Sequence, residues 1–169
     1  SVFVFSKWNW VFEETSSGEK DSQDMGRTMA PAAAITLKQH LEDFNLTPSD
    51  YDLIVTGDLS LYGSKVFVDI LKEYLIDVKD VYQDCGLMIY DIEKQQVSAG
   101  GSGCGCSASV LCSYILKKVK NKEFKKVLFI ATGALLSTTS SQQGDTIPGI
   151  AHAVVIESYE PTKKKTINN

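Results

Sequence analysis

The residues best able to do chemistry lie in a glycine- and cysteine-rich segment, Ala-Gly-Gly-Ser-Gly-Cys-Gly-Cys-Ser-Ala, over residues 99–108. An apolar stretch with helical spacing, Val110–Val119, follows directly. Glycine lets the backbone approach a ligand closely, and the start of a helix offers unpaired N–H donors and partial positive charge. The segment therefore predicts a cradle for an oxyanion or carboxylate. The alternative is a tight turn without a ligand that lets the helix pack close to a sheet. The candidate ligand-binding residues in this segment are Gly101, Gly103, Cys104, Gly105 and Cys106.

Asp58 is the acidic residue best placed to join this site. It follows a continuous apolar run, Leu53–Thr56, that is typical of a strand buried on both faces. In such sheets ligands bind beyond the carboxyl ends of the strands. An aspartate here can equally cap the turn before the next helix, and both interpretations stay open.

The same cysteines suggest a second kind of chemistry, a thiol nucleophile. Cys104 or Cys106 at a helix start would have a lowered pKa. A nucleophile also needs a base, and His152 is the only suitable one, although its apolar neighbours indicate a hydrogen-bonded histidine in a core strand. Cys85 and Cys112 are interpreted as small packing residues.

Cofactor motifs are missing from the sequence. The pattern G-x-G-x-x-G fails because Cys106 stands where its last glycine belongs, and no Gly-Lys-Ser/Thr exists for a P-loop. No two cysteines have the spacing of a zinc knuckle or redox motif, and His40 and His152 stand at no ligand-like offset from them. We therefore predict no cofactor, no metal site and reduced thiols.

The net charge of the chain limits which classes of partner it can bind. A net charge of −4 and a pI near 5.2 argue against a nucleic-acid surface. The lysines in Lys117–Lys126 and Lys163–Lys165 are interpreted as a solvated helix end and tail, with a weak contact to anionic lipid as the alternative. No secretory signal starts the chain and no apolar run approaches the ~20 residues that span a bilayer, so we expect a soluble or peripheral protein.

Strands and helices alternate along the 169 residues, which predicts an α/β fold with a mainly parallel sheet covered by helices on both faces.

Thr28 is expected to cap the first helix, and His40 falls off the apolar stripe of that helix and is expected to be exposed. The loops after Thr56, after Thr132-Gly133 and after Tyr90 are expected to meet a ligand. The expected strands are Val2–Phe5, Trp8–Phe12, Leu53–Thr56, Leu87–Tyr90, Glu93–Val97 as an edge, Val127–Ala131 and Ala151–Ile156, with polar loops at Glu13–Asp24 and Ser137–Gly149.

Four segments resemble the stage V sporulation protein AD family of endospore-forming bacteria: Met29–Ala34, Asp50–Ser64, Ser98–Ala108 and Val127–Glu157. The resemblance covers the chain from about Gly26, but only the C-terminal half of the family protein. It implies a thiolase-like half-domain over residues 1–160, with a five-stranded mixed, mainly parallel sheet in the order strand-helix three times and then two strands. Residues 161–169 are expected to be a disordered tail.

The resemblance also bears on catalysis. In the related ketoacyl synthases this half supplies a catalytic His and Asn, which would fall near Gly57-Asp58 and Gly100-Gly101, where neither residue type stands. Without these proton-transfer partners we expect a protein that is not an enzyme. The alternative is an acyl-thioester enzyme of the ketoacyl synthase or thiolase type, and a third possibility is a scaffold that only docks membrane partners.

What the family resemblance implies instead is binding of dipicolinic acid, as calcium dipicolinate, for its uptake into the developing spore. The protein would be a peripheral part of a membrane channel complex at the forespore or spore inner membrane. Expected partners are other stage V sporulation channel proteins, the missing N-terminal half of the same protein, and a second copy in a homodimer. Hydroxyls of Ser137–Ser141 would add donors to the ligand. A half-domain alone is expected to expose an apolar face and to self-associate.

Overall fold

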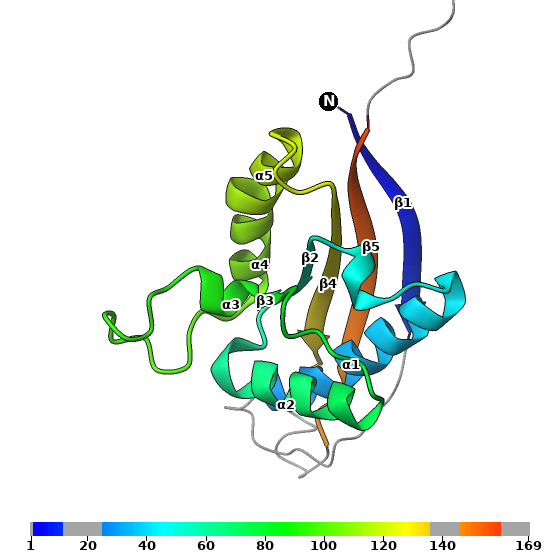
Figure 1. Ribbon diagram of the computed structural model, residues 1–169. Coiled ribbons are helices and arrows are strands. Elements are labelled where there is room, and N and C mark those ends of the chain that lie inside the picture. Colours follow the sequence, from blue (N-terminus) through cyan, green and yellow to red (C-terminus); the bar gives the residue numbers. More distant parts are fainter. Residues whose placement is uncertain (1, 12–24, 136–145, 160–169) are drawn as a thin grey trace, which may run out of the picture.

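The computed structural model describes residues 2–11, 25–135 and 146–159, which form one mixed sheet with helices on both faces (Figure 1). The strands are β1 (Val2–Val11), β2 (Leu53–Thr56), β3 (Tyr82–Asp84), β4 (Lys126–Ala134) and β5 (Gly149–Tyr159). The helices are α1 (Met25–Phe44), α2 (Ser60–Glu73), α3 (Cys85–Met88), α4 (Cys104–Val110) and α5 (Leu116–Lys120), with a 3-10 turn η1 (Pro48–Asp50) and a π-helical turn η2 (Leu111–Ile115).

The five strands lie in the order β1-β5-β4-β2-β3. β2 pairs in parallel with both β3 and β4, whereas β5 runs antiparallel to β4 and β1 antiparallel to β5. Every residue of β2 is buried, as its continuous apolar run predicts. The mixed α/β fold is confirmed, and so is the order of elements that the family resemblance implies, with the short helix α3 as an addition.

Each face of the sheet has its own hydrophobic core because side chains of a strand alternate between the two faces. α1 and α2 cover one face, and the continuous helical segment from α4 through η2 to α5 covers the other (Figure 1). The first core includes Leu37, Ile54, Phe67, Leu71, Leu128 and Ile130. The second includes Val55, Val110, Ile115, Val119, Val127 and Phe129.

The strands predicted at Leu87–Tyr90 and Glu93–Val97 are wrong. The first two residues of Leu87–Tyr90 lie in helix α3, which Asp84 caps by accepting the N–H of Gly86, and the last two form a bend. The stretch Glu93–Val97 forms turns and irregular chain without strand pairing. A short apolar run does not distinguish strand from buried helix, and the true strand, β3, lies just before the run.

Two expectations about α1 are also wrong. The helix begins at Met25 instead of after Thr28, which is a buried residue inside it, and Pro31 lies within its early turns. His40 is 0% exposed, and its Nε2 lies 2.7 Å from the hydroxyl oxygen of Tyr51. The segment after α1 folds back through η1 and places Tyr51 over this side of the helix, so that a position off the apolar stripe becomes buried.

Several predicted segments lie outside the described residues. They are the loop Glu13–Asp24, most of the loop Ser137–Gly149 including the hydroxyls of Ser137–Ser141, and the tail 161–169. Gly149 itself begins β5.

Candidate functional site

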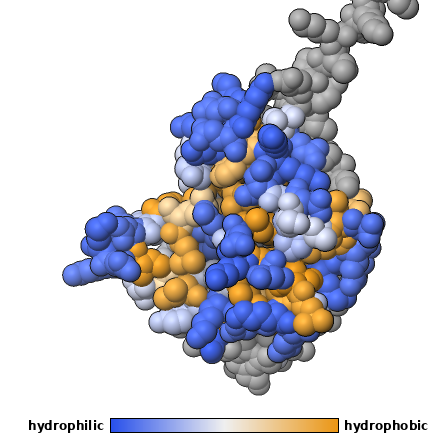
Figure 2. Space-filling view, in the orientation of Figure 1, coloured by the Kyte–Doolittle hydropathy of each residue, from blue (hydrophilic) through white to orange (hydrophobic). Residues whose placement is uncertain are grey.

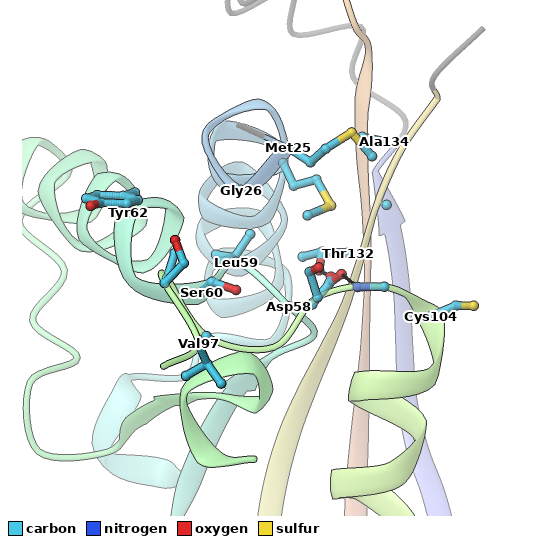
Figure 3. Close-up of a pocket in the computed structure, with 17 residues that line it drawn as sticks. Met25, Gly26, Asp58, Leu59, Ser60, Tyr62, Val97, Cys104, Thr132 and Ala134 are labelled. Carbon is cyan, nitrogen blue, oxygen red and sulfur yellow. Dashed lines mark hydrogen bonds between the residues drawn. The ribbon is translucent and has the colours of Figure 1, made fainter. Parts of the chain in front are cut away.

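A cavity of about 690 Å³ opens where β2 and β4 end (Figure 3). These two parallel strands bring their carboxyl ends to the same edge of the sheet, the usual place for a ligand site in an α/β fold. Asp58 and Leu59, in the loop after Thr56, line it, and on the other strand Thr132, Gly133 and Ala134 line it from the end of β4 itself. The described residues that line it are Met25, Gly26, Met29, Asp58, Leu59, Ser60, Tyr62, Val97, Ser98, Ala99, Gly100, Ser102, Gly103, Cys104, Thr132, Gly133 and Ala134.

Close contact between α1 and α2 shapes one wall of this cavity. Gly26, at the start of α1, and Gly63, in α2, face each other so closely that a Cβ built on Gly63 would lie 2.6 Å from the carbonyl carbon of Gly26. A Cβ on Gly26 would lie 2.3 Å from the carbonyl oxygen of Leu59. The two helix starts can approach this way only because both positions lack a side chain.

Asp58 connects the three elements that meet at the centre of the cavity. Its Oδ2 accepts the N–H of Gly103 at 2.7 Å, and its Oδ1 accepts the hydroxyl of Thr132 at 2.9 Å (Figure 3). Gly103 has φ +91°, a conformation that favours glycine. The amide that the sequence predicts as a donor to a ligand carboxylate is thus paired with a carboxylate of the chain itself.

The capping role that Asp58 might have played belongs to Asp84. This carboxylate is 1% exposed and accepts the backbone N–H groups of Leu59, Ser60 and Gly86, each at 2.9 Å. It also accepts the hydroxyl of Thr56 at 2.6 Å. Burial raises the pKa of Asp84 above its ordinary value, against the lowering effect of these donors. One buried residue therefore holds the end of β2 and the starts of α2 and α3 together.

The glycine-rich segment is attached to the same group of residues. The N–H of Gly101 donates to the carbonyl of Gly86 at 2.8 Å, and the hydroxyl of Ser60 donates to the carbonyl of Gly101 at 2.6 Å. A Cβ on Gly86 would lie 2.3 Å from the oxygen of Gly101. Ser60 itself adopts φ +57°. At Gly86, glycine therefore serves close packing of backbone on backbone, whereas a Cβ on Gly101 would lie 2.6 Å from the side chain of Ile89.

The six predicted site residues separate into two groups. Asp58, Gly103 and Cys104 line the cavity, although the thiol of Cys104 points away from Asp58 (Figure 3). Gly101, Gly105 and Cys106 line a second hollow of about 490 Å³ on the other side of the segment. Ile89 and Tyr90 also line that hollow, and the chain after Tyr90 reaches both hollows, since Val97 and Gly100 line this one and the cavity alike.

The buried thiols have raised pKa values. Burial, with smaller effects of Asp58 and Asp84, raises the pKa of Cys106 to about 11. Burial and Asp84 raise that of Cys85 to about 12. The expectation of a lowered pKa is therefore wrong for Cys106, because desolvation disfavours the thiolate more than the helix start favours it. Cys104 is exposed.

The sequence also predicts roles for Cys85, Cys112 and His152. Cys85 is a buried packing residue as expected, whereas Cys112 is exposed, so the packing role predicted for it is wrong. His152 lies in β5 opposite Ala131 and does not line the cavity. Its buried Nδ1 makes no hydrogen bond within the part of the chain that the structure describes.

Several further residues line the cavity without a signal in the sequence. The polar residues Ser98, Ser102 and Tyr62 and the apolar residues Met25 and Met29 line the cavity. Ser60 and Asp84 carry no signal in the sequence, because their roles depend on contacts between distant segments. Among the lining residues that the structure describes, Asp58 is the only carboxylate and none is Lys, Arg or His.

The comparisons with known proteins identify the family. The family model for stage V sporulation protein AD matches residues 14–157, most of the chain. The chain belongs to the stage V sporulation protein AD family. The stage V sporulation protein AD of Bacillus subtilis (strain 168) is 56% identical over 140 residues, which cover 83% of this chain and 41% of that relative. This member of the stage V sporulation protein AD family thus spans about two fifths of the length of its curated relative.

Two further observations apply to the described residues of this family member. None of their helices is long and apolar enough to cross a membrane. No group of three or more His, Cys, Asp or Glu side chains among them is arranged to hold a metal ion.

Proposed function

We propose that this chain is a thiolase-like half-domain that binds dipicolinic acid, as calcium dipicolinate, for its uptake into the developing spore. The observation that carries the proposal is the cavity at the ends of β2 and β4, in a chain of the stage V sporulation protein AD family. Its volume of about 690 Å³ lies in the range of small-molecule sites. Glycine-rich backbone and hydroxyl groups on one side and methionine side chains on another suit a flat ring that carries carboxylates.

The charge of the lining favours the calcium complex in this proposal. The described lining contributes the carboxylate of Asp58 and no cationic side chain. A free dianion would meet that negative charge, whereas the complex of dipicolinate with one calcium ion has no net charge. Ser98 and Ser102 offer neutral donors to the ligand carboxylates, and the N–H of Gly103 becomes available where the ligand displaces Asp58.

Titration calorimetry of the full-length protein with dipicolinate and calcium tests the proposal. We expect saturable binding and a loss of at least tenfold in affinity for Ser102→Trp, because this exposed lining residue would fill the cavity. Ser49→Trp is the matched control, since Ser49 is an exposed serine in η1, outside the cavity lining. Folded full-length protein without binding, or a Ser102→Trp variant that binds like the wild type, would refute the proposal.

We propose further that the site does not catalyse acyl transfer. The raised pKa of Cys106 supports this, because at a pKa of about 11 only about one thiol in a thousand is ionised at pH 8. Alkylation with iodoacetamide at pH 8 should therefore be slow at Cys106 and at Cys85, and fast at the exposed Cys104 and Cys112. The competing interpretation, an acyl-thioester enzyme, requires acyl transfer that Cys104→Ser abolishes, and that result would overturn the proposal.

The partners that we propose are the N-terminal half of the same protein, a second copy in a homodimer, and other stage V sporulation channel proteins at the spore inner membrane. Support for the first comes from the stretch from Cys104 to Leu116, which carries no charged residue although Ser109, Cys112 and Tyr114 are exposed. The same alkylation experiment tests the contact with the N-terminal half, because that half should shield Cys112 from iodoacetamide in the full-length protein. If Cys112 reacted equally fast in this chain alone and in the full-length protein, the proposed contact with the N-terminal half would be contradicted.

A further inference from the structure

A cluster of lysines lies at one end of the sheet. The segment Lys117–Lys126 holds six lysines and one glutamate in a chain whose net charge is −4. It includes the end of α5 and the first residue of β4, at the upper end of the molecule in Figure 1, and Figure 2 shows hydrophilic surface there. We call this segment the lysine end.

The helix dipole accounts for only part of this cluster. Lysines in the last turn of α5 compensate its carboxyl end. Lys125 and Lys126 lie beyond the helix and cannot serve that purpose. The acidic groups nearby also leave part of the charge exposed: Lys118 pairs with Glu123, and Lys126 lies 3.9 Å from Glu157. Asp52 accepts the backbone N–H groups of Lys125 and Lys126. Lys117, Lys120 and Lys125 are exposed.

We propose that the lysine end docks the protein on the surface of a bilayer that contains anionic lipid. Clusters of four to eight basic residues bind such surfaces through the summed attraction of the headgroups. Lysine suits a diffuse array of charges, whereas the planar arginine fork suits a defined partner, and the lysine end contains no arginine. The inference rests on the proposed place of the protein beside a membrane, and it does not depend on dipicolinate binding.

Docking through the lysine end would fix the orientation of the cavity relative to the bilayer. Lys126 begins β4 and Ala134, which lines the cavity, ends it. At about 3.3 Å per residue the two ends of the strand are about 25 Å apart. With the lysine end on the lipid, the cavity lies at the far end of the sheet and exchanges its ligand away from the headgroups.

Sedimentation of full-length protein with vesicles tests the proposal. We expect binding to vesicles of equal parts phosphatidylglycerol and phosphatidylcholine, little binding to pure phosphatidylcholine, and release as sodium chloride rises from 0.05 to 0.5 M. The triple variant Lys117→Gln, Lys120→Gln, Lys125→Gln should bind roughly 100-fold more weakly, since each basic residue contributes on the order of fivefold.

A second triple variant controls for the change of net charge. Lys65→Gln, Lys79→Gln, Lys94→Gln removes three exposed lysines outside the lysine end and should bind like the wild type. Equal losses in the two variants, no binding of wild-type protein to the anionic vesicles, or equally tight binding to duplex DNA would overturn the proposal. Both variants should keep wild-type dipicolinate titration, so that a failure of membrane docking is distinguished from a failure of the proposed function.

Discussion

Replacing Asp84 with alanine is expected to lower the free energy of unfolding by about 3 to 4 kcal/mol. The substitution removes four hydrogen bonds at a side chain that is 1% exposed. It leaves the buried N–H groups of Leu59, Ser60 and Gly86 without their acceptor, and an unpaired buried donor costs more than the hydrogen bond itself is worth. Urea unfolding followed by circular dichroism measures the change.

Asp52→Ala is the control for this variant. Asp52 also accepts two backbone N–H groups, those of Lys125 and Lys126, but it is exposed, so water replaces the lost acceptor. We expect a loss below about 1 kcal/mol. Equal losses for the two variants would show that the burial of Asp84 does not matter. A stable Asp84→Ala protein with unchanged dipicolinate affinity would show that Asp84 does not hold the cavity walls.

The parts of the fold that the sequence predicts well are those that depend on local pattern. The run Leu53–Thr56 is apolar at nearly every position and forms the buried central strand β2. Asp58 is predicted to join the site because it follows that strand, and it lines the cavity. The run at Leu87–Tyr90 is also short and mostly apolar, but its first two residues lie in a helix, because Asp84 caps the start of that helix.

The parts that could not be predicted depend on contacts between distant segments. Apart from its local bond to Gly86, Asp84 binds residues 24 to 28 positions away, and the sequence near it does not indicate those contacts. The glycine-rich segment predicts a site, but not which of its residues face which hollow. Gly103 lines the cavity, whereas Gly105 lines the second hollow. His40 was expected to be exposed because the pattern of one helix cannot show that Tyr51 covers it.

Gly63→Ala is expected to lower the free energy of unfolding by about 3 kcal/mol. Its new Cβ would lie 2.6 Å from the carbonyl carbon and oxygen of Gly26 and 2.8 Å from its Cα. All three are backbone atoms, which cannot rotate away, so α1 and α2 must separate. Alanine's higher helix propensity, worth about 1 kcal/mol, offsets only part of this cost. Because α1 and α2 form one wall of the cavity, dipicolinate affinity should fall as well.

Gly105→Ala provides the matched comparison, because both substitutions add one methyl group to a helical glycine. Nothing lies within 4 Å of a Cβ built on Gly105, and its φ is not in the positive range. The gain in helix propensity is then unopposed, so we expect a rise of about 0.5 kcal/mol in the free energy of unfolding. Urea unfolding of the two variants should therefore give opposite signs. A Gly63→Ala protein as stable as Gly105→Ala would mean that α1 and α2 do not meet at Gly26, and the wall of the cavity would have to be built differently.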